Sequence, residues 1–309
     1  MLNGGQSHEA PLLNLLRPTK CDAIVSAHSG RDEDVNIRSD ATLKVMFHGN
    51  RFAAVKELVQ GFEAENPGER LSWTSLPPKN TINAIKSVGR DPEISSVAFL
   101  PDVVLGPQAL QNAILPLRDD GVQVVNVGRY SSVTGVVAIA RSSDDRVRTA
   151  GDRLSSSLIA GTSLRVVLPG FQERTQVFIR TFDTLLGPGG LDQLAATGRV
   201  DVGGVRHHRD IPSRIRSGCG DIGIQFLQSK VYWEMQSPGV FQFLDVQSQR
   251  KDLEQEDSYV FIVKPNSAST PTVSPIRAMS VDAFVGYMFS RSALTILRKY
   301  GLQPSGIEH

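Results

Sequence analysis

Two histidines, an arginine and an aspartate stand side by side in GVRHHRDIPSRIRSG, residues 204–218. Such a cluster could hold a metal ion, an anion or a substrate, and Arg209 can hold a carboxylate or an oxyanion in a two-pronged fork. A polar turn with solvated rings is the plain alternative. Because successive residues of an extended chain point in opposite directions, His207 and His208 can share one pocket only where the chain bends.

A second polar group, HGNR at residues 48–51, directly follows the apolar run LKVMF. His48 would end a buried strand, where a polar side chain costs free energy unless it is paired or lines a cavity. Asn50 could contact a ligand or cap the following helix, and Arg51 places a positive charge beside it. This turn is therefore a candidate binding site.

A third group opens a predicted helix and consists of Glu173, Arg174 and Thr175. Glu173 favours the positive end of the helix dipole there, whatever the function. Together with His48 and His208 it offers histidine and carboxylate ligands of the kind that zinc accepts. No HxH, HxxxH or CxxC spacing supports a metal site locally, so the metal site stays an alternative.

The positive charge near these turns favours an anion over a metal ion. Three arginines stand in or beside the turns, namely Arg51, Arg174 and Arg209. They would repel a cation and attract an oxyanion or a small carboxylate or phosphate compound. We therefore expect a small anionic ligand and no cofactor.

Catalysis is the third class of function that the cluster allows. A histidine beside Asp210 could act as a general base. No nucleophile elbow, P-loop or dinucleotide-binding GxGxxG accompanies it, and GPGG at 187–190 is typical of the end of a helix. We expect a binding protein that is not an enzyme.

Apolar runs and helical periodicity alternate along the chain after residue 41. A helix that begins at Phe52 has apolar residues at 3.6-residue spacing and stops at Asn66-Pro67-Gly68, a strong breaker. Strands are predicted at 43–47, 70–75, 102–106, 122–128, 135–141, 164–170, 221–226, 240–246 and 259–265. Further helices are predicted at 79–88, 107–115, 149–160, 173–186, 191–198, 211–218, 280–290 and 291–300.

This alternation predicts an α/β fold with mainly parallel sheets that helices cover on both faces. We expect an irregular leader at 1–40, a lobe I made of 41–134 and 265–309, and a lobe II at 135–264. Two extended crossover strands would join the lobes. A single doubly wound sheet is the simpler alternative.

Ligands of α/β sheets bind beyond the carboxyl ends of the strands, where helix starts attract anions. Three predicted strand-to-helix turns offer such starts, at 48–51, 169–175 and 207–212. In the third turn, Asp210 would cap a helix that begins with Ile211-Pro212. These turns are where we expect the binding residues to gather.

The composition argues against nucleic acid and a membrane as partners. The 309 residues carry 33 basic and 32 acidic side chains, a formal net charge of +1, with no basic run suited to nucleic acid. No apolar run approaches the roughly 20 residues that a membrane span needs. The longest apolar stretch of the leader, APLLNLL, is too short and interrupted for a secretory signal. The two cysteines, Cys21 and Cys219, are expected to be free thiols.

Three segments together resemble the type II periplasmic solute-binding proteins of the molybdate type. LKVMFHGNRFAAVKELVQGFEAENPG resembles the opening strand, small loop and long helix of that family. RIRSGCGDIGIQF is similar to its helix–glycine–strand element, and ALTILRKYGLQP to its closing helix. The resemblance covers about residues 42–304 and implies a two-lobed fold that closes on a solute.

The resemblance also implies binding residues. Asn50 takes the position of the family's first-loop serine, and Ser75 stands beside the position of the second-loop serine. His208 takes the place of a residue that donates a backbone N–H, and Phe226 replaces a tyrosine. The ligand's identity is therefore left open.

The family works outside the cytoplasm, often with a membrane transporter, whereas the leader shows no signal. Location is accordingly left open between the two compartments, with uptake or sensing as the role. We expect a monomer with a small anion as its ligand.

Overall fold

The computed structural model describes residues 35–76, 81, 100–108, 110, 122–133, 135–149, 151–169, 176–201, 208–246, 256–265 and 275–305. These residues divide into two compact units. Unit 1 lies within Gly135–Glu254, and unit 2 lies within Gly30–Thr134 and Gln255–His309. From residue 35 onward the chain thus passes between the units twice. The alternative of one doubly wound sheet is wrong because each unit has a sheet of its own.

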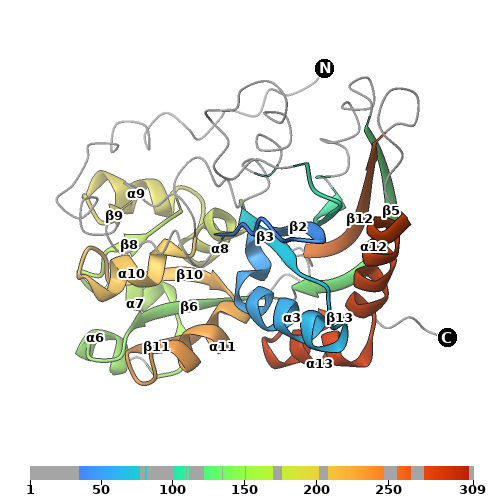
Figure 1. The fold of residues 1–309 in the computed structure, drawn as a ribbon. Coiled ribbons are helices and arrows are strands. Elements are labelled where there is room, and N and C mark those ends of the chain that lie inside the picture. Colours follow the sequence, from blue (N-terminus) through green and yellow to red (C-terminus); the bar gives the residue numbers. More distant parts are fainter. Residues whose placement is uncertain are drawn as a thin grey trace, which may run out of the picture. The chain divides into compact units, whose positions relative to one another are not determined.

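The described part of unit 2 contains a mixed sheet of seven strands (Figure 1). Their order is β1 (Val35–Asn36), β3 (Leu71–Leu76), β2 (Leu43–His48), β4 (Val103–Gly106), β12 (Glu256–Pro265), β5 (Val122–Val133) and β13 (Gln303–Pro304). Strands β3, β2 and β4 are parallel, whereas β12 is antiparallel to β4 and β5. The expectation of a mainly parallel sheet is corrected here, because the two strands that lead to and from unit 1 run in opposite directions.

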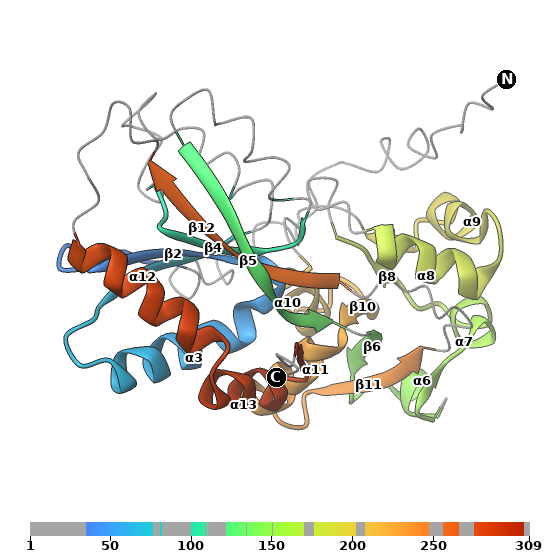
Figure 2. The same cartoon turned by 90° about the vertical axis from the view of Figure 1, so that its right-hand side faces the viewer.

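Strands β5 and β12 form a long two-stranded ribbon within this sheet (Figure 2). The whole of β12 pairs with unit 2, and the second change of unit follows Glu254. The sequence had placed this boundary after residue 264. The difference arises because the hydrogen bonds of β12 go to β4 and β5 along its entire length.

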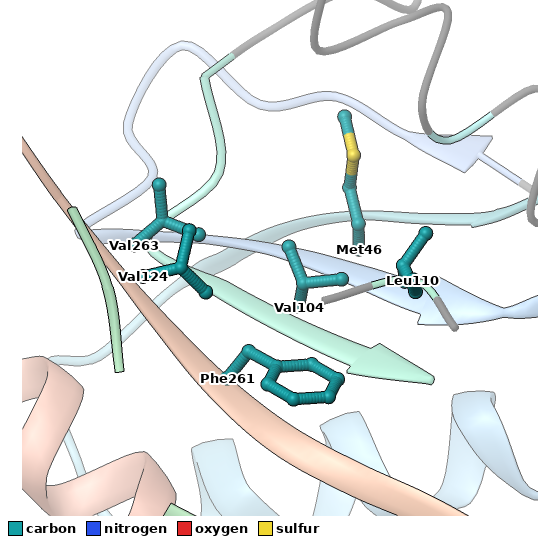
Figure 3. Close-up of a cluster of buried hydrophobic side chains, with 6 residues drawn as sticks. All are labelled: Met46, Val104, Leu110, Val124, Phe261 and Val263. Carbon is teal, nitrogen blue, oxygen red and sulfur yellow. The ribbon is translucent and has the colours of Figure 1, made fainter. Parts of the chain in front are cut away.

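A cluster of buried apolar side chains lies on this sheet (Figure 3). It joins four strands and the residues after β4, and consists of Met46, Val104, Leu110, Val124, Phe261 and Val263. Burying each such side chain stabilises the fold by about 1.5–3 kcal/mol. The cluster therefore holds the parallel strands and the β5–β12 ribbon in one sheet.

Three helices complete unit 2: α3 (Phe52–Glu65), α12 (Pro275–Met288) and α13 (Arg291–Lys299). Helix α3 buries the apolar face that its spacing predicts, including Leu58 and Phe62. The ring of Phe62 packs edge-on against Phe284 and Tyr287 of α12, at centroid distances of 5.2 and 5.6 Å. Helix α13 lies beside α3 (Figure 1). The C-terminal helices therefore fix the helix that follows the β2–α3 turn, which we define as residues 48–51.

The described part of unit 1 also has a mixed sheet. Its strand order is β7 (Arg153–Leu154), β11 (Phe241–Val246), β6 (Val136–Arg141), β10 (Ile222–Phe226), β8 (Val166–Val167) and β9 (Val200–Asp201). Strands β10, β8 and β9 are parallel, and β6 runs antiparallel to both of its neighbours. Its helices are α6 (Asp145–Arg148), α7 (Ser156–Ala160), α8 (Gln176–Leu186), α9 (Gly190–Ala196), α10 (Asp210–Arg216) and α11 (Leu227–Gln236).

One carboxylate precedes a central strand in each unit and ties it to the parallel neighbour. Asp102, just before β4, accepts the backbone N–H of Lys44 at 2.8 Å and the Nε–H of Arg277 at 2.6 Å. Asp221, just before β10, accepts the backbone N–H of Arg165 at 2.8 Å and its Nε–H at 3.2 Å. Hydrogen bonds to one carboxylate thus align the amino ends of the parallel strands in both units.

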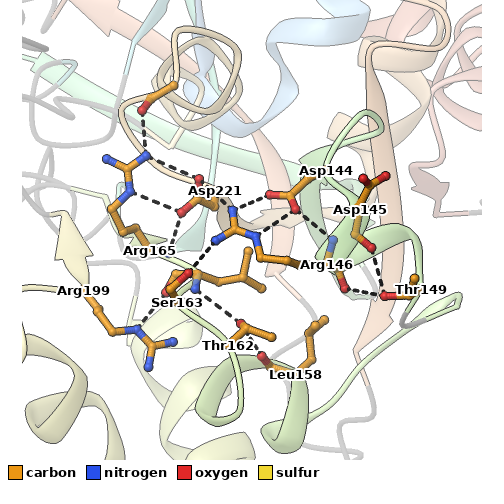
Figure 4. Close-up of polar contacts among 12 residues, drawn as sticks. Asp144, Asp145, Arg146, Thr149, Leu158, Thr162, Ser163, Arg165, Arg199 and Asp221 are labelled. Atoms are coloured by element: carbon orange, nitrogen blue, oxygen red, sulfur yellow. Dashed lines mark hydrogen bonds and ion pairs between the residues drawn. The ribbon is translucent and has the colours of Figure 1, made fainter.

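The carboxylate in unit 1 belongs to a larger polar network (Figure 4). Arg146 places its guanidinium 3.4 Å from Asp221 and donates to Asp144, with nitrogen–oxygen distances of 2.6 and 2.9 Å. The hydrogen bond from Arg146 holds the pKa of the Asp144 carboxyl below its usual value. Asp144 also caps α6 by accepting the backbone N–H of Arg146 at 3.0 Å.

Several element predictions need correction. The single helix expected at 149–160 is instead β7 and α7, separated from α6 by a turn in which Gly151 has a φ of +76°. Helix α11 was not predicted, and the strand expected at 164–170 shortens to Val166–Val167. The helices expected at 79–88 and 107–115 fall largely outside the described residues.

Cys219 is disulfide-bonded, and its side chain is buried. The prediction of free thiols is therefore wrong. The other cysteine of the chain, Cys21, lies outside the described residues, as do residues 1–34 of the predicted leader. The last residues of that leader are described, and Val35–Asn36 form β1, paired with β3, where the sequence predicted an irregular segment. Within the part of the chain that is described, no helix has the length and apolar character that a membrane crossing requires.

Alanine substitutions at two helical glycines should change the free energy of unfolding in opposite directions. A Cβ at Gly61 of α3 would overlap the hydroxyl of Tyr287, whose ring is fixed by Phe62, whereas a Cβ at Gly286 of α12 would meet nothing within 4 Å. We expect Gly61→Ala to lower the free energy of unfolding by about 1–3 kcal/mol through overpacking. Gly286→Ala should raise it by about 0.5–1 kcal/mol through helix propensity. Urea unfolding of both variants measures this, and equal effects would contradict the packing described.

The Asp144–Arg146 pair should make part of the stability depend on pH. A carboxyl with a lowered folded-state pKa stabilises the protein above its unfolded pKa of about 3.9 and loses that contribution as the pH falls through the folded-state pKa. Asp144→Asn keeps an oxygen to cap α6 but removes the charge. The free energy of unfolding of the wild type should exceed that of this variant by about 1 kcal/mol at neutral pH, and the difference should disappear in acid. Urea unfolding across a pH series measures the gap, and a gap that is constant with pH would refute the assignment.

Candidate functional site

The β2–α3 turn lies where three parallel strands of unit 2 end. His48 is the last residue of β2 and pairs with Leu76 at the end of β3, while Ser75 pairs with Phe47. A Cβ placed on Gly106, the last residue of β4, would lie 3.6 Å from the Cβ of His48. The ends of β3, β2 and β4 therefore meet around His48.

The polar residues at this edge are buried. The exposed fractions are 2% for His48, 6% for Asn50, 0% for Arg51 and 1% for Ser75. Polar groups withdrawn from water to this extent cost free energy unless they make hydrogen bonds. The edge of the sheet is thus a buried polar region, in contrast to the apolar cluster on the same sheet.

The local sequence explains why the turn forms there. The apolar run that ends at Phe47 makes β2, and Gly49–Arg51 form a single 3-10 turn before α3. Neither His48 nor Arg51 caps these helical segments with its side chain, and the first turn of α3, which is described in full, carries no acidic residue. An anion at this helix start would meet the positive end of the dipole without a competing carboxylate.

The side chain of Arg51 makes a contact inside unit 2. Its Nε–H donates to the hydroxyl of Ser131 in β5, with an N–O distance of 3.2 Å. Both residues are fully buried. Arg51 thus links the β2–α3 turn to the β5–β12 ribbon.

In unit 1, His208 packs among aromatic side chains. Its ring meets Phe226 and Phe178 edge-on at centroid distances of 5.2 and 5.9 Å, and the residue is fully buried. Its carbonyl oxygen accepts the side-chain amide of Gln225 at 2.6 Å and the backbone N–H of Ile211 at 3.1 Å. This geometry fixes the backbone of the turn before α10 and places two phenylalanine rings against the imidazole.

The start of α10 differs slightly from the prediction. The helix begins at Asp210, and Arg209 occupies the position before it without a side-chain cap. Asp210 is therefore the first helical residue and not the cap. Arg214 of the same helix is fully buried and donates to Asp201 at the end of β9, at 2.6 and 3.0 Å. This ion pair anchors α10 to the carboxyl edge of β9.

Several of the predicted site residues lie outside the described residues. They are Glu173, Arg174, Thr175 and His207. His48 and His208 belong to different units. Among the described residues, no group of three histidine, cysteine, aspartate or glutamate side chains could hold a metal ion. The metal alternative through His48, His208 and Glu173 thus gains no support from the described part of the chain.

Sequence reasoning missed other buried polar residues near the strand ends. Gln225, Gln228 and Ser229 follow one another around the junction of β10 and α11, and all are fully buried. Gln225 interrupts the apolar run of DIGIQF, which was a signal available in the sequence. Ser131 and Ser258 carried no comparable signal, because their roles follow from the pairing of β5 with β12.

The chemistry that this edge of unit 2 offers is hydrogen bonding. An imidazole, a carboxamide and a hydroxyl come from His48, Asn50 and Ser75, and the β2–α3 turn itself contains no carboxylate. Such groups can surround an acceptor-rich ligand, as oxyanions are.

No family model matches the chain, and no curated protein matches it by sequence. Solved structures do match its fold. The periplasmic molybdate-binding protein of Azotobacter vinelandii is 17% identical, with a TM-score of 0.56, and the match covers 84% of this chain and 98% of that one.

Two further solved structures match the fold over a similar share of this chain. The tungstate-binding protein TupA from Desulfovibrio alaskensis G20 is 13% identical, with a TM-score of 0.50 and coverage of 85% and 98%. The sulfate-binding protein SubI from Mycobacterium tuberculosis H37Rv is 11% identical, with a TM-score of 0.51 and coverage of 85% and 86%. The chain therefore has the fold of the type II periplasmic binding proteins.

Proposed function

We propose that this protein is a solute-binding protein that takes a small oxyanion or a related small anionic compound. The observation that carries the proposal is the buried polar edge of unit 2. His48, Asn50 and Ser75 lie there at or beside the ends of β2 and β3, next to a helix start whose first turn carries no acidic residue. Hydrogen-bond donors and a helix dipole suit an anion, because both interactions strengthen with negative charge.

The fold supports the same class of function. The matched structures are named for the molybdate, tungstate or sulfate that they bind. A fold hosts many functions, so this likeness supports the proposal only together with the site.

The disulfide at Cys219 supports a location for the protein outside the cytoplasm. Disulfides persist in oxidising compartments and are rare in the cytosol. Because Cys219 is disulfide-bonded, we place the protein outside the cytoplasm. One solved structure that matches the fold is named as the substrate-binding domain of a putative molybdenum ABC transporter from Clostridium difficile, and we propose such a transporter partner here.

Asn50 and Ser75 should matter for anion affinity. Thermal unfolding of the wild type is followed with sulfate, molybdate, tungstate, phosphate and small carboxylates, and with zinc as a separate arm. An anion at 100 times its dissociation constant should stabilise the protein by about 2.7 kcal/mol. Each of Asn50→Ala and Ser75→Ala should weaken binding of that anion by about tenfold or more, the value of one hydrogen bond to a charged group.

Ser72→Ala is the matched control for Ser75→Ala. Ser72 lies in the same strand and is as deeply buried, but its hydroxyl meets the backbone of Arg38 at the other end of β3. The affinity of this variant should equal that of the wild type. Stabilisation by zinc alone, or equal losses in Ser72→Ala and Ser75→Ala, would refute the proposed site.

Counting the free cysteines tests the disulfide directly. Iodoacetamide applied to the unreduced, denatured protein isolated from its native compartment should label no cysteine, and it should label both after reduction. Mass spectrometry gives the count. Full labelling before reduction would contradict the extracytoplasmic location that we propose.

A further inference from the structure

The β2–α3 turn is joined to the strands by which the chain leaves and re-enters unit 2. Arg51 donates from Nε to the hydroxyl of Ser131, and both side chains are fully buried. Ser131 lies three residues before Thr134, the last residue of this part of unit 2. The contact therefore spans from the proposed anion site to the first crossing point.

The returning strand lies directly across from this contact. Ser258 of β12 pairs with Ser131 of β5, and Ser258 follows the second crossing, at Glu254, by four residues. Directly opposed residues of antiparallel strands point to the same face of a sheet. The hydroxyl of Ser258 thus lies on the face that receives the Arg51 side chain, and it is buried with no hydrogen-bond partner among the described residues.

The pairing is irregular at this point. The register between β5 and β12 shifts between Ser258 and Tyr259, which is the mark of a bulge. Bulges bend a strand and interrupt its ladder, and they allow a ribbon to change its twist locally. A guanidinium seated beside such an irregularity can stabilise one arrangement of the two strands over another, because its five donors have fixed directions.

We infer that Arg51 is a positioning residue that couples the β2–α3 turn to both crossing strands, so that an anion held at the turn also orders the ends of β5 and β12. This inference rests on the proposed function for its ligand, but the coupling itself is a property of the ligand-free chain. Two elements that share one buried hydrogen bond stabilise each other reciprocally. Disturbing the strand side should therefore loosen the turn, and disturbing the turn side should loosen the strands.

Amide hydrogen exchange of the ligand-free protein tests the coupling. Ser131→Ala should accelerate exchange of the amides of residues 49–52 by about fivefold, the factor that corresponds to one buried hydrogen bond. Arg51→Lys should accelerate exchange at residues 131–133 and 256–258 by a similar factor, because an ammonium cannot keep the guanidinium's directed contact.

Ser132→Ala is the matched control. It removes the same hydroxyl from the neighbouring residue, whose side chain lies on the other face of β5 and reaches the carbonyl of Gln303 at 3.5 Å. This variant should leave exchange at residues 49–52 unchanged. Unchanged exchange there in Ser131→Ala, or an equal increase in Ser132→Ala, would overturn the inference, as would uniform acceleration over all of unit 2.

A second measurement separates this inference from the proposed function. Tungstate, molybdate and sulfate serve as probes, and exchange is repeated with the one that binds the wild type. Bound probe should slow exchange both at the turn and at residues 131–133 in the wild type, but only at the turn in Ser131→Ala. If neither these probes nor the phosphate and small carboxylates of the thermal screen bind, the proposed function fails while the ligand-free experiment still decides the coupling. If the probe protects both regions equally in the wild type and Ser131→Ala, the coupling fails while the binding function stands.

Discussion

The alignment of the parallel strands in each unit depends on one buried carboxylate. Asp102 and Asp221 occupy equivalent places, each just before a central strand, and each accepts a backbone N–H from the strand beside it and an arginine side chain. Charge-assisted hydrogen bonds of this kind are about twice as strong as neutral ones. Because the amino ends of the strands are held level, their carboxyl ends also finish together, and that edge is where a parallel sheet binds ligands.

The proposed function follows from what the sequence places at those carboxyl ends. In unit 2 the edge carries His48, Asn50 and Ser75 in buried positions. Helix α3 begins there, and its body packs against α12 and α13. In unit 1 the corresponding turn is fixed by the contacts of His208 with two phenylalanines and by its carbonyl. The edge in unit 1 also carries buried polar side chains, Gln225, Gln228 and Ser229, but there the histidine packs against aromatic rings.

The sequence predicted the elements whose signal is local. Helix α3 combines regular apolar spacing with the Asn66-Pro67-Gly68 breaker, and β10 is a short apolar run, so both were placed correctly. Helix α11 was missed because its fully buried residues include Gln228 and Ser229, which reverses the usual pattern. The aromatic neighbours of His208 and the disulfide of Cys219 could not be predicted from the sequence, because both depend on partners remote along the chain.

The position of a bound anion tests the account most directly. Tungstate and selenate contain anomalous scatterers, so a crystal grown with either one locates the anion without prior assumptions. The account predicts an anomalous peak within hydrogen-bonding distance, about 3 Å, of donors on Asn50 or Ser75 at the ends of β2 and β3. A fully occupied peak elsewhere, with none at this edge, would contradict it.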